Sequence, residues 1–134
     1  MIRTLVVDDE ALARERIISL LKKENDIEVV GECSDGEEAL NKINNLKPDL
    51  VFLDIQMPMM SGVDVIKNLT DYLPEVIFVT AYDEYAVEAF EMNAIDYLLK
   101  PFDQERFFKT LARARQRILG NNTTEISEKL NNLF

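Results

Sequence analysis

Five short apolar runs alternate along the chain with five longer segments in which apolar residues recur at helical spacing. The runs at residues 50–53 and 76–79 contain no polar residue, which is typical of parallel strands that helices cover on both faces. From this pattern we expect strands at residues 2–7, 27–33, 50–53, 76–79 and 95–99.

The intervening segments carry the apolar stripe of an amphipathic helix. The second helix is expected to begin at residues 34–37, a Ser-Asp-Gly-Glu sequence with the pattern of a capping box, and the last to begin after Pro101 with Asp103 as its cap. The residues expected to face the core, helix by helix, are Ala13, Ile17, Leu20 and Leu21; Ala39, Leu40 and Ile43; Val65, Ile66 and Leu69; Ala86, Ala89 and Phe90; and Phe107, Leu111, Ala114 and Ile118.

This alternation of strands and helices predicts an α/β fold, a flavodoxin-like (βα)5 doubly wound parallel sheet with strand order 2-1-3-4-5. We expect residues 1–120 to form the domain. Gly120 and the polar residues after it are expected to break the last helix. Residues 121–134 would then be a linker or tail, either free or leading toward an output domain that is not present in this chain.

Composition and charge narrow the classes of function. The 134 residues are 47% hydrophobic, enough for one packed core, and carry a net charge of −10. Such an acidic surface repels nucleic-acid phosphates and anionic lipids, so we expect this domain to bind neither nucleic acid nor membrane directly. The single cysteine, Cys33, cannot form an intrachain disulfide, and no apolar leader is present; both favour the cytoplasm. The chain has no histidine, the commonest transition-metal ligand.

Polar residues follow four of the predicted strands at the point where each ends. Asp8 and Asp9 follow the first strand, Asp54 the third, Thr80 the fourth and Lys100 the fifth. In an open parallel sheet, the carboxyl ends of the strands lie at one edge, where ligands bind. The sequence therefore predicts that three carboxylates, a hydroxyl and an ammonium group converge there.

Carboxylates gathered in this way need a cation or a proton, because two of them ~4 Å apart repel by about 4 kcal/mol at an effective dielectric constant of 20. An open, all-oxygen site with no histidine suits Mg²⁺. Mg²⁺ and Lys100 around a carboxylate would suit phosphoryl transfer, in which the carboxylate itself can form an acyl phosphate. Singly, each residue has an ordinary structural explanation as a cap, turn, strand or surface residue. Their joint placement favours a site.

Four segments together resemble the motifs of two-component response-regulator receiver domains. They are Val6-Val7-Asp8-Asp9-Glu10, Leu53-Asp54-Ile55-Gln56-Met57-Pro58, Val79-Thr80-Ala81 and Leu99-Lys100-Pro101-Phe102. The match runs from about residue 2 to residue 119 and implies the CheY-like form of the fold. Residues 78–90 and 94–102 further resemble the LytTR subfamily, whose members carry a C-terminal DNA-binding domain and regulate transcription.

The resemblance implies a role for each matching residue. Asp54 would accept a phosphoryl group from the phosphohistidine of a partner sensor histidine kinase. Asp9, Asp54 and the main-chain carbonyl of Gln56 would hold Mg²⁺, with Asp8 reaching it through water. Lys100 would pair with one phosphoryl oxygen, and the Thr80 hydroxyl would bond another. The resemblance also implies a cis peptide bond before Pro101, and it places Tyr97 at an aromatic switch position.

A phosphoryl group would bring about −1.5 to −2 charge, enough to draw Thr80 and Lys100 toward Asp54. We therefore expect the Tyr97 ring to lie further inward in the phosphorylated form. Gln56 and Tyr82 lie two residues beyond Asp54 and Thr80, flanking the path of attacking water. Neither is an acid and Tyr82 is bulky, so slow loss of the phosphoryl group is expected.

The fourth helix, fifth strand and fifth helix would form the output face. Residues 81–96 contain five acidic residues and no basic one, whereas residues 103–119 contain five basic residues and two acidic ones. This contrast is either ordinary solvated surface or a means of setting the register of a homodimer formed on phosphorylation.

Three other functions compete with this interpretation. A haloacid-dehalogenase-like phosphatase would need a second acid two residues after the nucleophile, where this chain has Gln56. A nucleotide-binding module would need a glycine-rich loop after the first strand, and none is present there. A stand-alone receiver that acts by protein contact stays open. On balance we expect a phosphoacceptor that slowly loses its own phosphoryl group, not a turnover enzyme.

Overall fold

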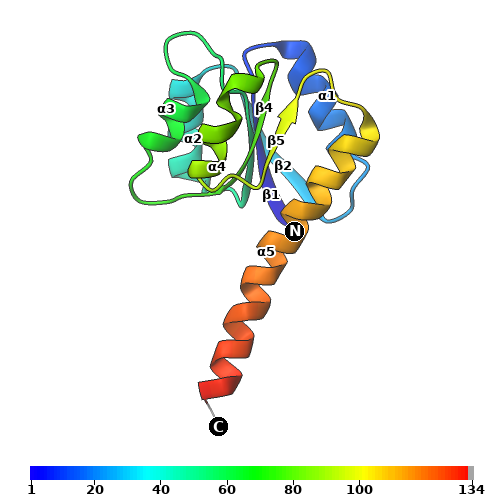
Figure 1. Cartoon of the computed structure of the whole chain (residues 1–134), viewed down its shortest axis with the longest axis vertical. Coiled ribbons are helices and arrows are strands. Elements are labelled where there is room, and N and C mark those ends of the chain that lie inside the picture. Colours follow the sequence, from blue (N-terminus) through cyan, green and yellow to red (C-terminus); the bar gives the residue numbers. More distant parts are fainter. Residues whose placement is uncertain (133–134) are drawn as a thin grey trace.

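The computed structural model describes residues 1–132, with side-chain surroundings through Gly120. Five parallel strands form one sheet in the order β2-β1-β3-β4-β5, which confirms the predicted topology. Figure 1 shows the helices on both faces of this sheet. The strands are β1 (Ile2–Val7), β2 (Ile27–Cys33), β3 (Leu50–Leu53), β4 (Glu75–Thr80) and β5 (Asp96–Leu99).

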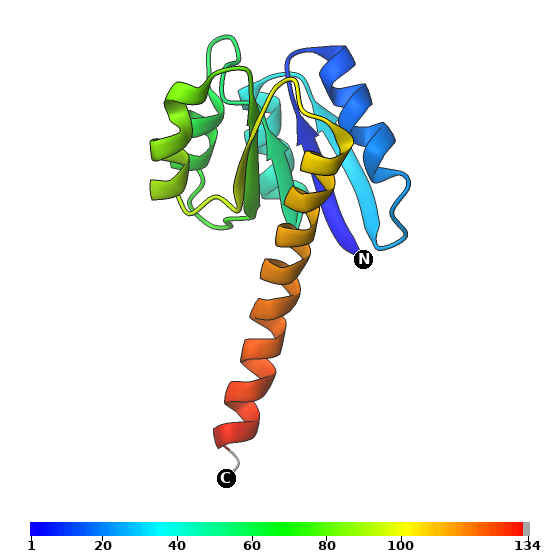
Figure 2. The same ribbon diagram turned by 45° about the vertical axis from the view of Figure 1, so that its right-hand side comes forward.

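The helices divide between the two faces of the sheet. α1 and α5 cover one face, and α2, α3 and α4 cover the other (Figures 1 and 2). A short 3-10 turn, η1, leads directly into α4. The bounds are α1 (Ala11–Leu21), α2 (Gly36–Leu46), α3 (Gly62–Lys67), η1 (Asp83–Tyr85), α4 (Ala86–Glu91) and α5 (Gln104–Asn132).

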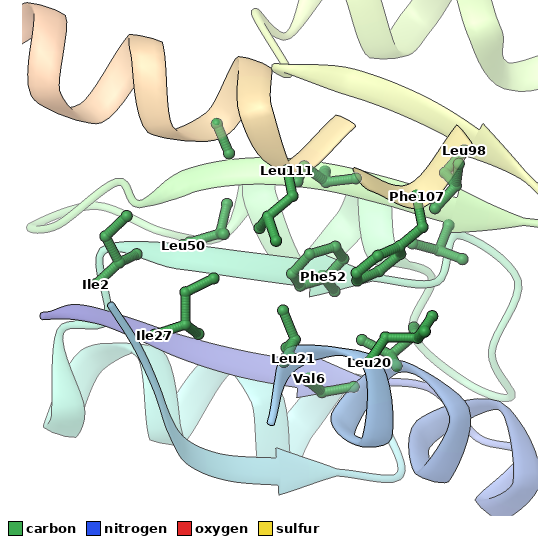
Figure 3. Close-up of a cluster of buried hydrophobic side chains, with 14 residues drawn as sticks. Ile2, Val6, Leu20, Leu21, Ile27, Leu50, Phe52, Leu98, Phe107 and Leu111 are labelled. Atoms are coloured by element: carbon green, nitrogen blue, oxygen red, sulfur yellow. The ribbon is translucent and has the colours of Figure 1, made fainter. Parts of the chain in front are cut away.

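The central strands are buried on both faces, which explains why their sequences show no polar alternation. Leu50 and Phe52 of β3 pack beneath α1 and α5, whereas Val51 and Leu53 of the same strand pack against α2, α3 and α4. In the first of these clusters, the rings of Phe52 and Phe107 stack with their centroids 5.5 Å apart (Figure 3). Each buried Phe of this kind contributes about 3–5 kcal/mol relative to Ala, so this contact fixes α5 on the sheet.

The helix caps agree only in part with the sequence pattern. Asp103 accepts a hydrogen bond from the Arg106 backbone N–H at 2.8 Å and caps α5, as predicted. At α2 the cap is Asp35, which accepts from the Glu38 N–H at 2.8 Å, so the predicted box formed by Ser34 and Glu37 is wrong by one residue.

Phe90 was expected to face the core, but its residue is 68% exposed. The reason is that α4 is six residues long and presents a narrow stripe. Ala89 is buried, and Tyr85 and Met92 pack against the core at positions four residues before and three after it. Phe90 is therefore left on the outer surface of α4.

The predicted break of the last helix at Gly120 is also wrong. α5 continues through Gly120 and the polar residues after it to Asn132, and it projects beyond the edge of the sheet where β1 begins (Figures 1 and 2). Gly120 does not have a positive φ. One glycine costs a helix interior only about 1 kcal/mol, too little to end a helix without a capping motif. The last residues of the predicted 121–134 linker, 133 and 134, lie outside the described part of the chain.

Candidate functional site

The predicted site forms at the edge of the sheet where β1, β3, β4 and β5 end. The backbone pairing continues one residue past these strands. The Asp54 N–H donates to the Val7 carbonyl at 3.0 Å, and the Lys100 N–H donates to the Thr80 carbonyl at 2.8 Å. The peptide bond between Lys100 and Pro101 is cis, as predicted. These bonds place Asp8, Asp54 and Lys100 at one edge of the sheet.

Lys100 lies among the carboxylates. Its Nζ is 2.6 Å from Asp8 Oδ2, 3.5 Å from Asp54 Oδ2 and 3.8 Å from Glu10 Oε1. The second carboxylate oxygen of Asp8 accepts the Glu10 backbone N–H at 2.9 Å. Asp54 is also contacted at both oxygens, but at longer distances: Oδ1 accepts the Gln56 N–H at 3.3 Å, and Oδ2 lies 3.5 Å from the ammonium group.

Burial and neighbouring charge perturb Asp54 strongly. Desolvation, followed by the charge of Asp8, raises the pKa of the Asp54 carboxyl to about 7, against the opposing effects of Lys100 and the Gln56 N–H. Burial acts to lower the pKa of the Lys100 ammonium, but its hydrogen bond to Asp8 and the nearby Asp54 raise it overall. Lys100 therefore stays charged while Asp54 titrates near neutrality, a perturbation typical of functional carboxylates.

Three acidic side chains that follow one another in the sequence form a cluster at the end of β1. Carboxylate oxygens of Asp8, Asp9 and Glu10 all lie within 4.8 Å of one another, with Asp8 buried and the other two exposed. Such an oxygen-only donor set on an open edge fits a hard divalent cation. Glu10 belongs to the sequence motif but was not predicted as a site residue. Its position directly after the two aspartates is the feature of the sequence that could have indicated it.

An open pocket of about 400 Å³ lies over Asp54, and Asp9, Gln56, Tyr82 and Lys100 help to line it. Five of the predicted site residues therefore border one solvent-accessible space. Asp54 itself is 4% exposed, so a group that reacted with it would enter through this pocket.

Thr80 and Tyr97 have partners in the loop after β4. Thr80 is fully buried, and its hydroxyl accepts the Tyr82 N–H at 3.4 Å. The Tyr97 hydroxyl donates to the Tyr82 carbonyl, and burial raises the pKa of the Tyr97 phenol. Both predicted switch residues thus contact the segment that leads from β4 into α4. Gln56 reaches the same segment, since its side-chain amide donates to the Tyr85 hydroxyl at 2.7 Å.

A third buried carboxylate, Asp96, was not predicted from the sequence as a site residue. Asp96 accepts hydrogen bonds from Arg106 at 2.8 Å, Thr110 at 2.7 Å and Arg113 at 3.1 Å, all on α5. Although burial acts to raise the pKa of Asp96, the bonds from Arg106 and Thr110 lower it to about 2. Arg106 also donates to the Tyr97 carbonyl at 3.3 Å. The network fixes α5 to β5 beside the predicted switch tyrosine.

Comparison with known proteins identifies the class to which this fold and site belong. Residues 4–112 match the model of the response regulator receiver domain. The chain belongs to this family. Receiver domains are parts of two-component regulators and are not turnover enzymes, which argues against the phosphatase considered above.

Individual relatives agree with this assignment. The chain is 52% identical over 117 residues to the transcriptional regulatory protein BtsR of Escherichia coli K12, covering 87% of this chain and 49% of BtsR. It thus spans about half the length of the curated relatives that it matches.

Among residues 1–132, no helix combines the length and apolar character needed to cross a bilayer.

Solved structures show the same fold. The response regulatory domain of protein mrkE from Klebsiella pneumoniae superposes with a TM-score of 0.80 at 34% identity, covering 88% of this chain and 98% of that one. A chain of the CheX–CheY–BeF3–Mg²⁺ complex of Borrelia burgdorferi superposes with a TM-score of 0.74 at 26% identity, covering 81% of this chain and 85% of that one.

Proposed function

We propose that this chain is the phosphoacceptor domain of a two-component transcriptional regulator and that Asp54 receives the phosphoryl group from a sensor histidine kinase. The observation that carries the proposal is the position of the Asp54 carboxylate at the base of an open pocket, 3.5 Å from the Lys100 ammonium. A nucleophile and a cation for the incoming phosphoryl oxygens therefore stand in one accessible space.

The transfer uses the ionised form of Asp54. One of its carboxylate oxygens attacks phosphorus, the bond from phosphorus to the donor imidazole breaks, and the imidazole takes up a proton as it leaves. The Lys100 ammonium, which lies 2.6 Å from Asp8 Oδ2 before the reaction, then moves toward the new negative charge and binds a phosphoryl oxygen. The Thr80 hydroxyl binds another oxygen after it gives up the Tyr82 N–H.

A divalent ion is proposed to bind between Asp54 and the acidic cluster of Asp8, Asp9 and Glu10. Asp9, Asp54 and the Gln56 carbonyl would hold Mg²⁺, with Asp8 bonded through water and Glu10 adding a nearby carboxylate. The ion would neutralise negative charge on the phosphoryl group. Support comes from the donor chemistry of the cluster and from the Borrelia CheY complex, which contains BeF3 and Mg²⁺.

The test is to incubate the chain with acetyl phosphate and Mg²⁺ and to measure its intact mass. The wild type should gain one phosphoryl group, and Asp54→Asn should gain none. Asp49→Asn is the matched control, because Asp49 precedes β3 at the opposite end of the strand from Asp54. Turnover of a generic phosphomonoester without a stable adduct would favour a phosphatase instead.

Phosphorylation is proposed to act on the α4-β5-α5 face and to promote a homodimer. Three apolar residues there face solvent: Val87 is 71% exposed, Phe90 68% and Leu99 43%. Charged side chains are expected to contribute less to the dimer contact, because arginines of α5 already form ion pairs within the chain. Arg106 and Arg113, for example, both pair with Asp96. We therefore assign the contact to these apolar side chains rather than to the opposite charges of the two helices.

Sedimentation with and without beryllofluoride tests the homodimer. The wild type should shift toward dimer, and Phe90→Ser should stay monomeric. Leu12→Ser is the matched control, because Leu12 is 79% exposed but lies on α1, which is not part of the proposed interface. An unchanged monomer in the wild type would contradict this part of the proposal.

The output is proposed to be transcription, through a LytTR-type DNA-binding domain that follows residues 121–134 in the full-length cytoplasmic protein. Support comes from the transcriptional relative BtsR, of which this chain covers 49%. The α5 helix, which projects from the domain as far as Asn132, would carry the connection. The alternative is a stand-alone receiver, and the length of the natural gene product decides between the two.

A further inference from the structure

The Gln56 side chain lies between two open pockets. One is the pocket over Asp54 described above. The other lies between α3 and α4 and is lined by Asp64, Lys67, Tyr85 and Glu88. Because Gln56 lines both pockets, its side-chain amide can adopt two orientations, one toward Asp54 and one toward Tyr85.

In this structure the amide is held toward Tyr85. Gln56 Nε2 donates to the Tyr85 hydroxyl at 2.7 Å, a short and well-formed hydrogen bond. The Lys67–Glu88 ion pair, with 3.4 Å between Nζ and Oε1, bridges α3 and α4 across the same pocket. Tyr85 itself is half-buried and packs against the core beneath α4. The hydroxyl that holds Gln56 is therefore attached to a well-supported ring.

From this arrangement we infer that Tyr85 is a positioning residue that prolongs the life of the phosphoryl group by holding the Gln56 amide away from the water that would hydrolyse it. The inference rests on the proposed phosphorylation of Asp54. It extends that proposal to a residue 31 positions along the chain that does not itself line the pocket over Asp54.

The Gln56 amide would affect hydrolysis of the phosphoryl group through the hydrogen bond that its carbonyl oxygen can accept from water. Hydrolysis requires a water oxygen to attack phosphorus, while the bond from phosphorus to the Asp54 oxygen breaks and the carboxylate leaves. The released phosphate takes the water oxygen, and a water proton passes to solvent or to the phosphate. A Gln56 amide turned toward Asp54 would accept a hydrogen bond from that water through its carbonyl oxygen and orient it. The bond to Tyr85 opposes this turn.

The test measures the loss of the phosphoryl group after the donor is removed, in four variants of the chain. Tyr85→Phe keeps the ring and deletes the hydroxyl, so phosphoryl loss should accelerate about five-fold, the effect expected from one net hydrogen bond. In Gln56→Met, which has no amide, the same Tyr85→Phe change should have no effect. Tyr72→Phe is the matched control, because its hydroxyl donates to the Pro48 carbonyl at 2.6 Å, away from the site. Its rate should equal that of the wild type.

Two results would overturn the inference while leaving phosphorylation of Asp54 intact. One is an unchanged or slower rate in Tyr85→Phe. The other is an equal acceleration by Tyr85→Phe in the Gln56→Met background, since the effect would then not pass through the amide. If the wild type takes up no phosphoryl group at Asp54, the proposed function fails and the inference fails with it. The three failures are distinguishable in the same experiment.

Discussion

The Lys100 ammonium is bound more closely to Asp8 than to Asp54: the two N–O distances are 2.6 and 3.5 Å. The carboxylate proposed to be phosphorylated is therefore the less neutralised of the two, and its pKa is raised to about 7. Because Lys100 is shared unequally between two buried carboxylates, the negative charge of Asp54 is only partly neutralised. Asp54 can therefore bind a cation or attack phosphorus.

Replacing Asp54 by Asn should stabilise the domain above neutral pH. The Asp54 pKa is about 7 in the folded chain and 3.8 as a reference value, so its contribution is fully present below about pH 4 and is lost as pH rises through 7. Asp54→Asn should raise the free energy of unfolding by about 1–3 kcal/mol at pH 8 and by little at pH 4. Urea titration at both pH values measures this. An equal effect at the two would contradict the assigned pKa.

Replacing Lys100 by Met should destabilise the domain. The change leaves the buried Asp8 carboxylate without its cation, and breaking a buried pair in this way costs about 3 kcal/mol. Lys67→Met, which removes a lysine from the exposed pair with Glu88, should cost well under 1 kcal/mol. Urea titration at pH 7 compares the two variants, and similar losses in both would show that Lys100 is not bound to Asp8 as described.

The Asp96 network should stabilise the domain only where Asp96 is ionised. Its pKa of about 2 lies below the reference value of 3.8, so its contribution is present above about pH 4 and is lost as pH falls through 2. Asp96→Asn should cost about 2 kcal/mol at pH 7, because Arg106 and Arg113 lose charged partners. Thermal unfolding at pH 7 and pH 2 should show this loss shrinking in acid; a loss that persists at pH 2 would argue for a packing effect instead.

Mg²⁺ should raise the melting temperature of the wild type. An ion at 100 times its Kd adds about 2.7 kcal/mol to the stability of a folded chain that alone binds it. Asp9→Asn should remove most of the shift and Glu10→Gln a smaller part, because Asp9 is a proposed ligand of the ion, whereas Glu10 is only a nearby carboxylate. Asp49→Asn should keep the full shift. If Asp9→Asn responds to Mg²⁺ like the wild type, the ion is not held by this cluster.

Much of the site could be predicted from the sequence, since Asp8, Asp54 and Lys100 each directly follow the apolar end of a predicted strand. In a parallel sheet those positions must meet at one edge. The predictions that were wrong depended on weaker local signals in the sequence. Phe90 lies one residue past a narrow stripe on a six-residue helix, and Gly120 weakens a helix without ending it.

The Gln56–Tyr85 and Asp96–Arg106 contacts could not have been predicted in the same way. They join side chains from different elements, at separations of 29 and 10 residues. No periodic pattern encodes such pairs. They depend on how loops and helix ends settle once the sheet has formed.

Mapping the phosphorylated residue tests the central claim most directly. After reaction with acetyl phosphate and Mg²⁺, borohydride reduces an aspartyl phosphate to homoserine, which sequencing of the peptides by mass spectrometry can locate. We predict homoserine at position 54 and unmodified aspartates at positions 8 and 9. Homoserine at position 8 or 9 instead, or an unmodified Asp54, would contradict the account.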